Sequence, residues 1–125
     1  VLEPLSGYMI LAEMLYNNKK SVSGAWNFGP HDEDAKTVRW IVENLSRKWG
    51  TIIDPEFDSS KQPHEAHFLK LDISKAKQQL GWKPRWSLDT ALDKIIFWQK
   101  AYLKGEDMRS ICINQISEYT RKEQL

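Results

Sequence analysis

Four residues with charged or hydrogen-bonding side chains stand close together near the middle of the sequence: His64, Glu65, His67 and Lys70. We expect this stretch to be extended, with alternate side chains on opposite faces. One face then carries Glu65 and His67, and the other carries His64 and Lys70. Imidazole and ammonium groups bind anionic oxygens through charge-assisted hydrogen bonds. We therefore predict that His67 or Lys70 contacts a phosphate, or that His64 and Glu65 contact hydroxyl groups.

Two other interpretations of this stretch stay open. It could be an ordinary solvent-exposed polar loop. Histidine and glutamate are also metal ligands, but a metal site would need a third ligand, and Cys112 lies far along the chain. We expect no metal.

A second candidate for ligand contact is Asn27, within the run Trp26-Asn27-Phe28-Gly29-Pro30. A short predicted strand ends here, and loops at the ends of strands often form binding pockets. The alternative is that Trp26 and Phe28 fill the core while Asn27 occupies a turn.

The spacing of apolar residues predicts several helices and a few short strands. The first helix starts at Glu3 and Pro4, with Glu3 as its cap, and its apolar residues form one stripe: Leu5, Tyr8, Met9, Ala12, Leu15 and Tyr16. Further helices are expected from Thr37 to Gly50, from Asp72 to Gly81, from Ser87 to Leu103 and after Gly105. Short strands are expected at 25–28, 51–53 and 68–71. The predicted class is α+β, mostly helical.

Composition narrows the functional classes. A chain of 125 residues makes one domain, and a net charge of +1 with scattered basic residues indicates neither a nucleic-acid nor a membrane-surface partner. No apolar run approaches the roughly 20 residues that span a bilayer. The single Cys112 excludes an internal disulfide and suits a reducing compartment. We expect a soluble, cytoplasmic protein.

The sequence contains no glycine-rich motif of the kind that binds the phosphates of a nucleotide. Phosphate-binding loops require glycines at close, fixed spacing, as in G-x-G-x-x-G. The glycines here stand at 7, 24, 29, 50, 81 and 105. We therefore expect this chain to bind no dinucleotide by itself.

Four stretches nevertheless resemble a known family: VLEPLSGY, AWNFGP, PHEAHFLKLDISKA and LGWKPRWSLDTAL. They resemble the C-terminal half of bacterial CDP-glucose 4,6-dehydratases, members of the extended short-chain dehydrogenase/reductase superfamily. The resemblance runs from Val1 to about Tyr119. The stretch from Asp72 to Leu92 is shared by many nucleotide-sugar epimerases and dehydratases, whereas LEPLSGY and HEAHFLKLD are particular to the CDP-glucose branch.

The resemblance implies that different parts of the protein bind the cofactor and the substrate. An N-terminal Rossmann domain, absent from these residues, binds NAD and supplies every catalytic residue, and residues 1–125 bind the nucleotide-sugar. No catalytic residue is therefore assigned here, and this chain alone is expected to be inactive. The stretch from His64 to Lys70 matches the place where relatives grip the nucleotide diphosphate, often with arginine.

The implied enzyme converts CDP-glucose to CDP-4-keto-6-deoxyglucose, a precursor of dideoxyhexoses in cell-surface polysaccharides, and is a homo-oligomer when complete. Two alternatives stay open. One is another nucleotide-sugar dehydratase or epimerase, and the other is a helical interaction module without enzymatic activity.

Overall fold

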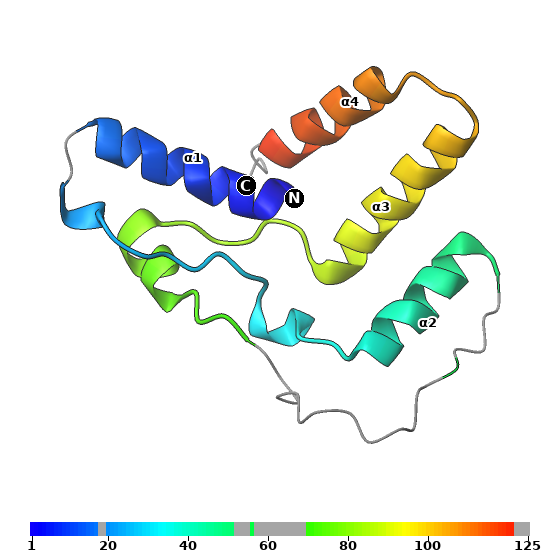
Figure 1. Cartoon of the computed structure of the whole chain (residues 1–125), viewed down its shortest axis with the longest axis horizontal. Coiled ribbons are helices and arrows are strands. Elements are labelled where there is room, and N and C mark those ends of the chain that lie inside the picture. The colour runs from blue at the N-terminus through cyan, green and yellow to red at the C-terminus, as the bar shows by residue number, and fades with distance from the viewer. Residues whose placement is uncertain (18–19, 52–55, 57–69, 122–125) are drawn as a thin grey trace.

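The computed structural model describes residues 1–17, 20–51, 56 and 70–121. Within these ranges the chain is mostly helical, as predicted, and no residue lies in a strand. In Figure 1, α3 and α4 form a helical hairpin, α2 lies beside α3, and the segment that contains η3 runs along α1. The elements are α1 (Leu2–Tyr16), η1 (Lys20–Val22), η2 (Asp32–Asp34), α2 (Val38–Trp49), η3 (Ala76–Leu80), α3 (Leu88–Leu103) and α4 (Met108–Thr120).

The strand predicted at 25–28 is wrong. A strand needs a neighbouring strand to pair its backbone groups, and no described segment supplies one. A side chain takes part of that role, because Lys75 Nζ donates to the carbonyl oxygen of Ala25 at 2.9 Å. The same ammonium lies 4.1 Å from the centre of the Trp26 ring, a cation–π contact that holds η3 to this stretch.

The other two predicted strands fall mainly outside the described residues. Of 51–53 only Thr51 is described, and of 68–71 only Lys70 and Leu71; all three have irregular backbone. The α+β class therefore has no support in the part of the chain that the structure describes.

The helix ends predicted at Thr37, Gly50 and Ser87 are confirmed by their caps. The hydroxyl oxygen of Thr37 accepts from the Trp40 amide at 3.2 Å and starts α2, and that helix ends at Gly50 with a φ of 93°. Ser87 and Asp107 cap α3 and α4 in the same way. Short polar side chains and left-handed glycines thus mark where these helices begin and end.

The helix predicted after Asp72 also forms, with a different backbone. The Asp72 carboxylate accepts from the Ser74 amide at 2.8 Å, as a cap should. From Ala76 to Leu80 the chain is a π-helix, a wider turn than the predicted α-helix, and it ends at Gly81 with a φ of 66°.

The main core lies between this π-helix and α1. Its buried members are Val22, Ile73, Ala76, Leu80 and Trp82, and the partly buried side chains that pack on them are Ile10, Leu11, Met14, Trp26 and Phe28. The interpretation of Trp26 and Phe28 as core-filling residues is therefore confirmed.

The apolar stripe predicted for α1 is exposed along its whole length: Leu5, Tyr8, Met9, Ala12, Leu15 and Tyr16. The residues turned toward the core are Gly7, Ile10, Leu11 and Met14. Periodicity could not select the face, because α1 carries apolar residues on nearly its whole circumference.

Gly7 fixes the rotation of α1. A Cβ atom at this position would lie 2.3 Å from the Phe28 ring, so only glycine permits this approach. The Phe28 ring in turn packs edge-on against Trp82, with ring centres 5.0 Å apart. Close contact between α1 and the core therefore depends on a missing side chain.

Gly7→Ala separates this contact from helix propensity. Propensity alone favours alanine by about 0.8–1 kcal/mol in a helix interior, whereas overpacking against Phe28 costs about 1–3 kcal/mol. We expect a net loss of stability in urea-unfolding curves. Met9→Ala, on the exposed side of the same helix, should change stability by less than about 0.5 kcal/mol. A Gly7→Ala protein more stable than the wild type would contradict this account.

Candidate functional site

Two of the five predicted contact residues lie within the described ranges. Lys70 and Asn27 are both exposed, and Asn27 Nδ2 donates to the carbonyl oxygen of Asp72, two residues after Lys70, at 3.3 Å. The other three, His64, Glu65 and His67, lie outside the described residues. The site can therefore be built from its Lys70 side.

Lys70 lies at a polar pocket of about 400 Å³. The pocket is formed by the segment that leads into η3 and by η2, which lies across from it. Its lining residues are Asp32, Lys70, Leu71, Asp72, Ile73, Ser74 and Lys77. This volume lies within the range of small-molecule sites.

The charges of the pocket are balanced between two lysines and two aspartates. Lys70 Nζ lies 2.7 Å from Asp32 Oδ2, in a pair whose side chains are both well exposed. The hydrogen bonds from Ser74 lower the pKa of Asp72, and the nearby Lys70 and Lys77 lower it further. Asp72 therefore stays ionised as the cap of the helical turn.

The pocket can exchange an internal partner for an external anion. An exposed ion pair contributes about 0–1 kcal/mol to stability, so separating Lys70 from Asp32 costs little free energy. A phosphate gives an ammonium group more acceptor oxygens than one carboxylate does. Lys77, on the adjacent turn, supplies a second positive charge at the same pocket. Lysine lacks the paired donors of arginine, so it offers charge without a bidentate geometry.

Sequence reasoning assigned no ligand contact to the other polar residues of this pocket: Asp32, Asp72, Ser74 and Lys77. Ser74 and Lys77 lie three residues apart in the predicted helix, so their shared helix face was a signal for them. Asp32 had no such signal, because only the folded chain brings residue 32 next to residue 70.

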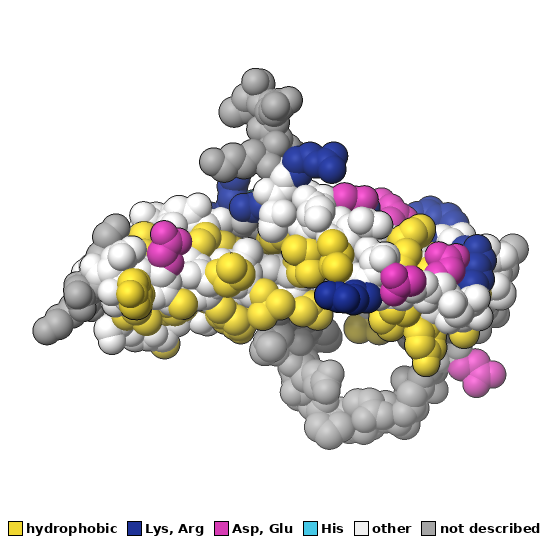
Figure 2. Space-filling view, turned by 90° about the horizontal axis from the view of Figure 1, so that it is seen from above, with side chains coloured by type: hydrophobic (Ala, Val, Ile, Leu, Met, Phe, Trp, Pro, Cys, Tyr) yellow, Lys and Arg dark blue, Asp and Glu magenta, His cyan; other side chains and the backbone are white. Residues whose placement is uncertain are grey.

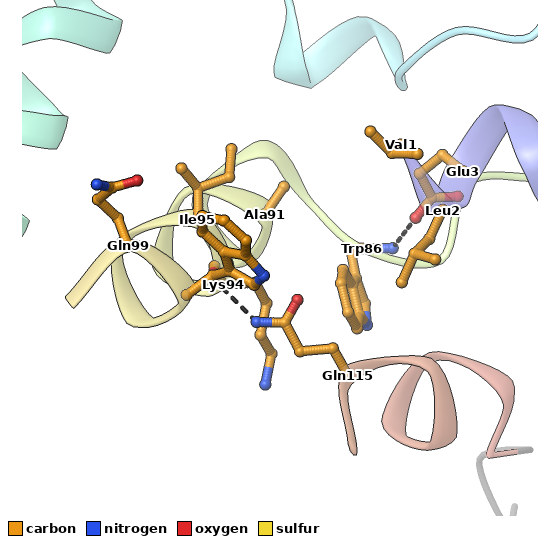
Figure 3. Close-up of a pocket in the computed structure, with 10 residues that line it drawn as sticks. Val1, Leu2, Glu3, Trp86, Ala91, Lys94, Ile95, Gln99 and Gln115 are labelled. Atoms are coloured by element: carbon orange, nitrogen blue, oxygen red, sulfur yellow. Dashed lines mark hydrogen bonds between the residues drawn. The ribbon is translucent and has the colours of Figure 1, made fainter. Parts of the chain in front are cut away.

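A second, more apolar pocket of about 390 Å³ lies between the start of α1, α3 and α4 (Figure 3). Trp86 and Ile95 give it aromatic and aliphatic walls, and Lys94 and Gln115 stand at its edge. Gln115 Nε2 donates to the Lys94 carbonyl oxygen at 3.0 Å. Gln115 and Glu3 already bond to backbone, and the Lys94 ammonium pairs with Glu118, so this pocket offers mainly packing surface.

Glu3 borders this second pocket and does not cap α1 as predicted. It lies inside the helix, whose first turn begins at Leu2. Its carboxylate instead accepts from the backbone amide of Arg85, at 3.0 and 3.1 Å, and from that of Trp86, at 2.8 Å. The Glu3 carboxylate therefore binds backbone amides of the linker that precedes α3, more than 80 residues away in the sequence.

Tyr119, near the end of α4, completes the Glu3 cluster. Its hydroxyl donates to Glu3 Oε2 at 2.7 Å, and its ring packs edge-on against Trp86. Burial, together with the neighbouring Glu3 carboxylate, raises the pKa of Tyr119 to about 12, although a hydrogen bond with Ser6 opposes the shift. Arg85 Nη1 donates to the Tyr119 carbonyl oxygen at 2.7 Å. One carboxylate thus joins α1, the linker and α4.

Other site types were also sought. Within the described ranges, no three His, Cys, Asp or Glu side chains are grouped as metal ligands. The metal interpretation of His64, Glu65 and His67 concerns residues outside those ranges. None of the described helices has the length and apolar character needed to cross a membrane.

Comparison with known proteins confirms the resemblance noted from the sequence. The chain is 51% identical over 119 residues, 95% of its length, to the CDP-glucose 4,6-dehydratase of Salmonella typhimurium (strain LT2). It spans only about one third (33%) of that protein. No family model matches the chain.

Glu3→Gln tests whether this carboxylate holds the helices together. The amide keeps one acceptor oxygen and turns an N–H group toward donors, so we expect a loss of about 2 kcal/mol in the free energy of unfolding. Chemical denaturation measures it. Glu13→Gln, at an exposed position of the same helix, should have almost no effect. Equal stability of the two variants would show that the cluster contributes nothing.

The raised pKa of Tyr119 predicts a loss of stability at alkaline pH. An unfolded tyrosine releases its proton near pH 10, while the folded one holds it to about pH 12. The unfolded state therefore binds fewer protons in this window, and stability falls as pH rises from 10 to 12.

Urea unfolding at several pH values measures this slope. Tyr119→Phe should flatten it by up to about 2 kcal/mol across the window, whereas Tyr102→Phe, at an exposed ring, should leave it unchanged. An unaltered slope in Tyr119→Phe would mean that the phenol titrates normally.

Proposed function

We propose that this chain is the nucleotide-sugar-binding portion of an NAD-dependent CDP-glucose 4,6-dehydratase, a lyase. The observation that carries the proposal is 51% identity over 119 residues to the Salmonella typhimurium dehydratase. The complete enzyme would convert CDP-glucose to CDP-4-keto-6-deoxyglucose for dideoxyhexose-containing polysaccharides. It would act in the cytoplasm as a homo-oligomer.

The polar pocket supports a role in diphosphate binding. Lys70 and Lys77 line it, and Asn27 lies beside the same segment. In the proposed site Lys70 leaves Asp32 and pairs with a phosphate oxygen, and Lys77 adds the second cation. His64, Glu65 and His67 precede Lys70 closely in the sequence, and we propose them as further contacts to the diphosphate or the sugar.

NAD binding is assigned to polypeptide outside this chain. Gly50 and Gly81 take a left-handed backbone at the ends of helices, where they close the helix rather than cradle a pyrophosphate. No described segment has a strand that leads into a glycine-rich turn. These residues therefore do not fit a dinucleotide, and we derive no step of the reaction from them.

The proposal is tested with a chimera in which this chain replaces the matched third of the Salmonella dehydratase. We expect the chimera, given NAD and CDP-glucose, to form a 4-keto sugar, detected by its absorbance in alkali. The 125-residue chain alone should form none. A folded chimera without turnover, or turnover by the isolated chain, would overturn the proposal.

Charge substitutions in the same chimera test the pocket. Lys70→Ala should raise the KM for CDP-glucose about fivefold to tenfold, because one charge-assisted hydrogen bond to phosphate is lost. Asp32→Asn should lower KM about twofold to fivefold, because Lys70 no longer has a competing partner. Lys83→Ala, an exposed lysine that does not line the pocket, is the matched control. Asp32→Asn and Lys70→Ala changing KM in the same direction would exclude this binding mode.

Nucleotide preference decides between this enzyme and a relative with another substrate. Calorimetric titration of the chimera with CDP and UDP would show tighter binding of CDP. A clear preference for UDP would favour a different nucleotide-sugar dehydratase or epimerase.

A further inference from the structure

Helix α1 is apolar on both of its sides. One side packs on the core through Ile10, Leu11 and Met14. The opposite side carries the exposed stripe defined above, from Leu5 to Tyr16. Figure 2 shows hydrophobic side chains gathered over α1 on the face seen from above. A helix that is apolar all round is typical of a buried layer rather than of a surface.

We propose that the exposed stripe of α1 is a docking surface for the remaining polypeptide of the same enzyme, the two thirds that the Salmonella relative has and this chain does not match. This inference rests on the proposed function. It makes α1 the middle layer of the complete protein, covered on one side by the core described here and on the other by the absent portion.

The size of the stripe argues against a second copy of this chain as its partner. α1 has 15 residues, so its exposed face is about 22 Å long and about 10 Å wide. A stable dimer buries about 800 Å² on each partner, which is several times the area of a face with this length and width. A covalently joined domain needs no such area, because linkage itself keeps its local concentration high.

The charges of the helix argue against a lipid surface. Helices that lie on membranes carry lysine and arginine opposite their apolar face. α1 has no basic residue, and its charged residues are Glu3 and Glu13. Glu3 is already engaged with the linker and α4. The stripe therefore fits a protein layer better than anionic headgroups.

Cysteine labelling measures the burial of this stripe directly. Met9 and Val38 are matched positions, since 73% of Met9 and 74% of Val38 is exposed, and Val38 lies on α2, outside the stripe. Met9→Cys and Val38→Cys are made both in the 125-residue chain and in the chimera. A maleimide reagent labels each protein, and mass spectrometry of the peptides reports the rate at each site.

We expect Met9→Cys to react roughly tenfold or more slowly in the chimera than in the isolated chain, because labelling then requires local opening. Val38→Cys should react at similar rates in both. Equal rates for Met9→Cys would overturn the proposal. So would protection of Met9→Cys in the isolated chain that grows with its own concentration, or that appears only with vesicles that contain the anionic lipid phosphatidylglycerol.

The labelling result and the proposed function can fail separately. Labelling reports coverage of α1 whether or not CDP-glucose binds, and calorimetry with CDP on the same chimera reports binding whether or not α1 is covered. Protection of Met9→Cys without CDP binding would support the docking surface and contradict the proposed substrate. CDP binding without protection would support the proposed substrate and contradict the docking surface.

Discussion

The carboxylate of Glu3 is the group on which the relative placement of the helices depends. It accepts two backbone amides of the linker before α3 and the hydroxyl of Tyr119 on α4. A carboxylate has the lone pairs to serve three donors at once, and charge-assisted bonds are stronger than neutral ones. Ser6, one turn further along α1, accepts from the Trp82 indole at 2.8 Å and ties the helix to the main core. The first two turns of α1 thus bond to the linker and α4 through Glu3, and to the main core through Ser6.

This arrangement gives the polar pocket its support. The main core holds Ile73, which lines the pocket, and Ala76, which precedes Lys77, and the Asp72 cap fixes where the turn begins. Among the described residues, the side chain of Lys70 forms an ion pair with Asp32 in which both side chains are well exposed. Such a pair contributes about 0–1 kcal/mol, so it constrains the lysine much less than the core constrains the backbone around it. In the apolar pocket beside Glu3, the Gln115 side-chain amide already donates to the Lys94 carbonyl oxygen.

The two faces of α1 contact different surroundings. The core side depends on Gly7, whose missing side chain admits Phe28, and the outer side presents apolar groups to solvent. Such a helix is expected in the interior of a protein larger than 125 residues. Identity to one third of a dehydratase agrees with that expectation.

The sequence by itself determined the local features of this protein. Thr37, Ser87, Gly50 and Gly81 set helix ends, because capping and left-handed backbone depend on a few neighbouring residues. The sequence also carried the resemblance to CDP-glucose 4,6-dehydratases. Tertiary structure decided the rest: the exposed face of α1, the role of Glu3 as a distant cap, the absence of a strand at 25–28 and the position of Asp32 beside Lys70. These features depend on contacts between residues far apart in the chain, and neither spacing nor propensity records which distant partner is near.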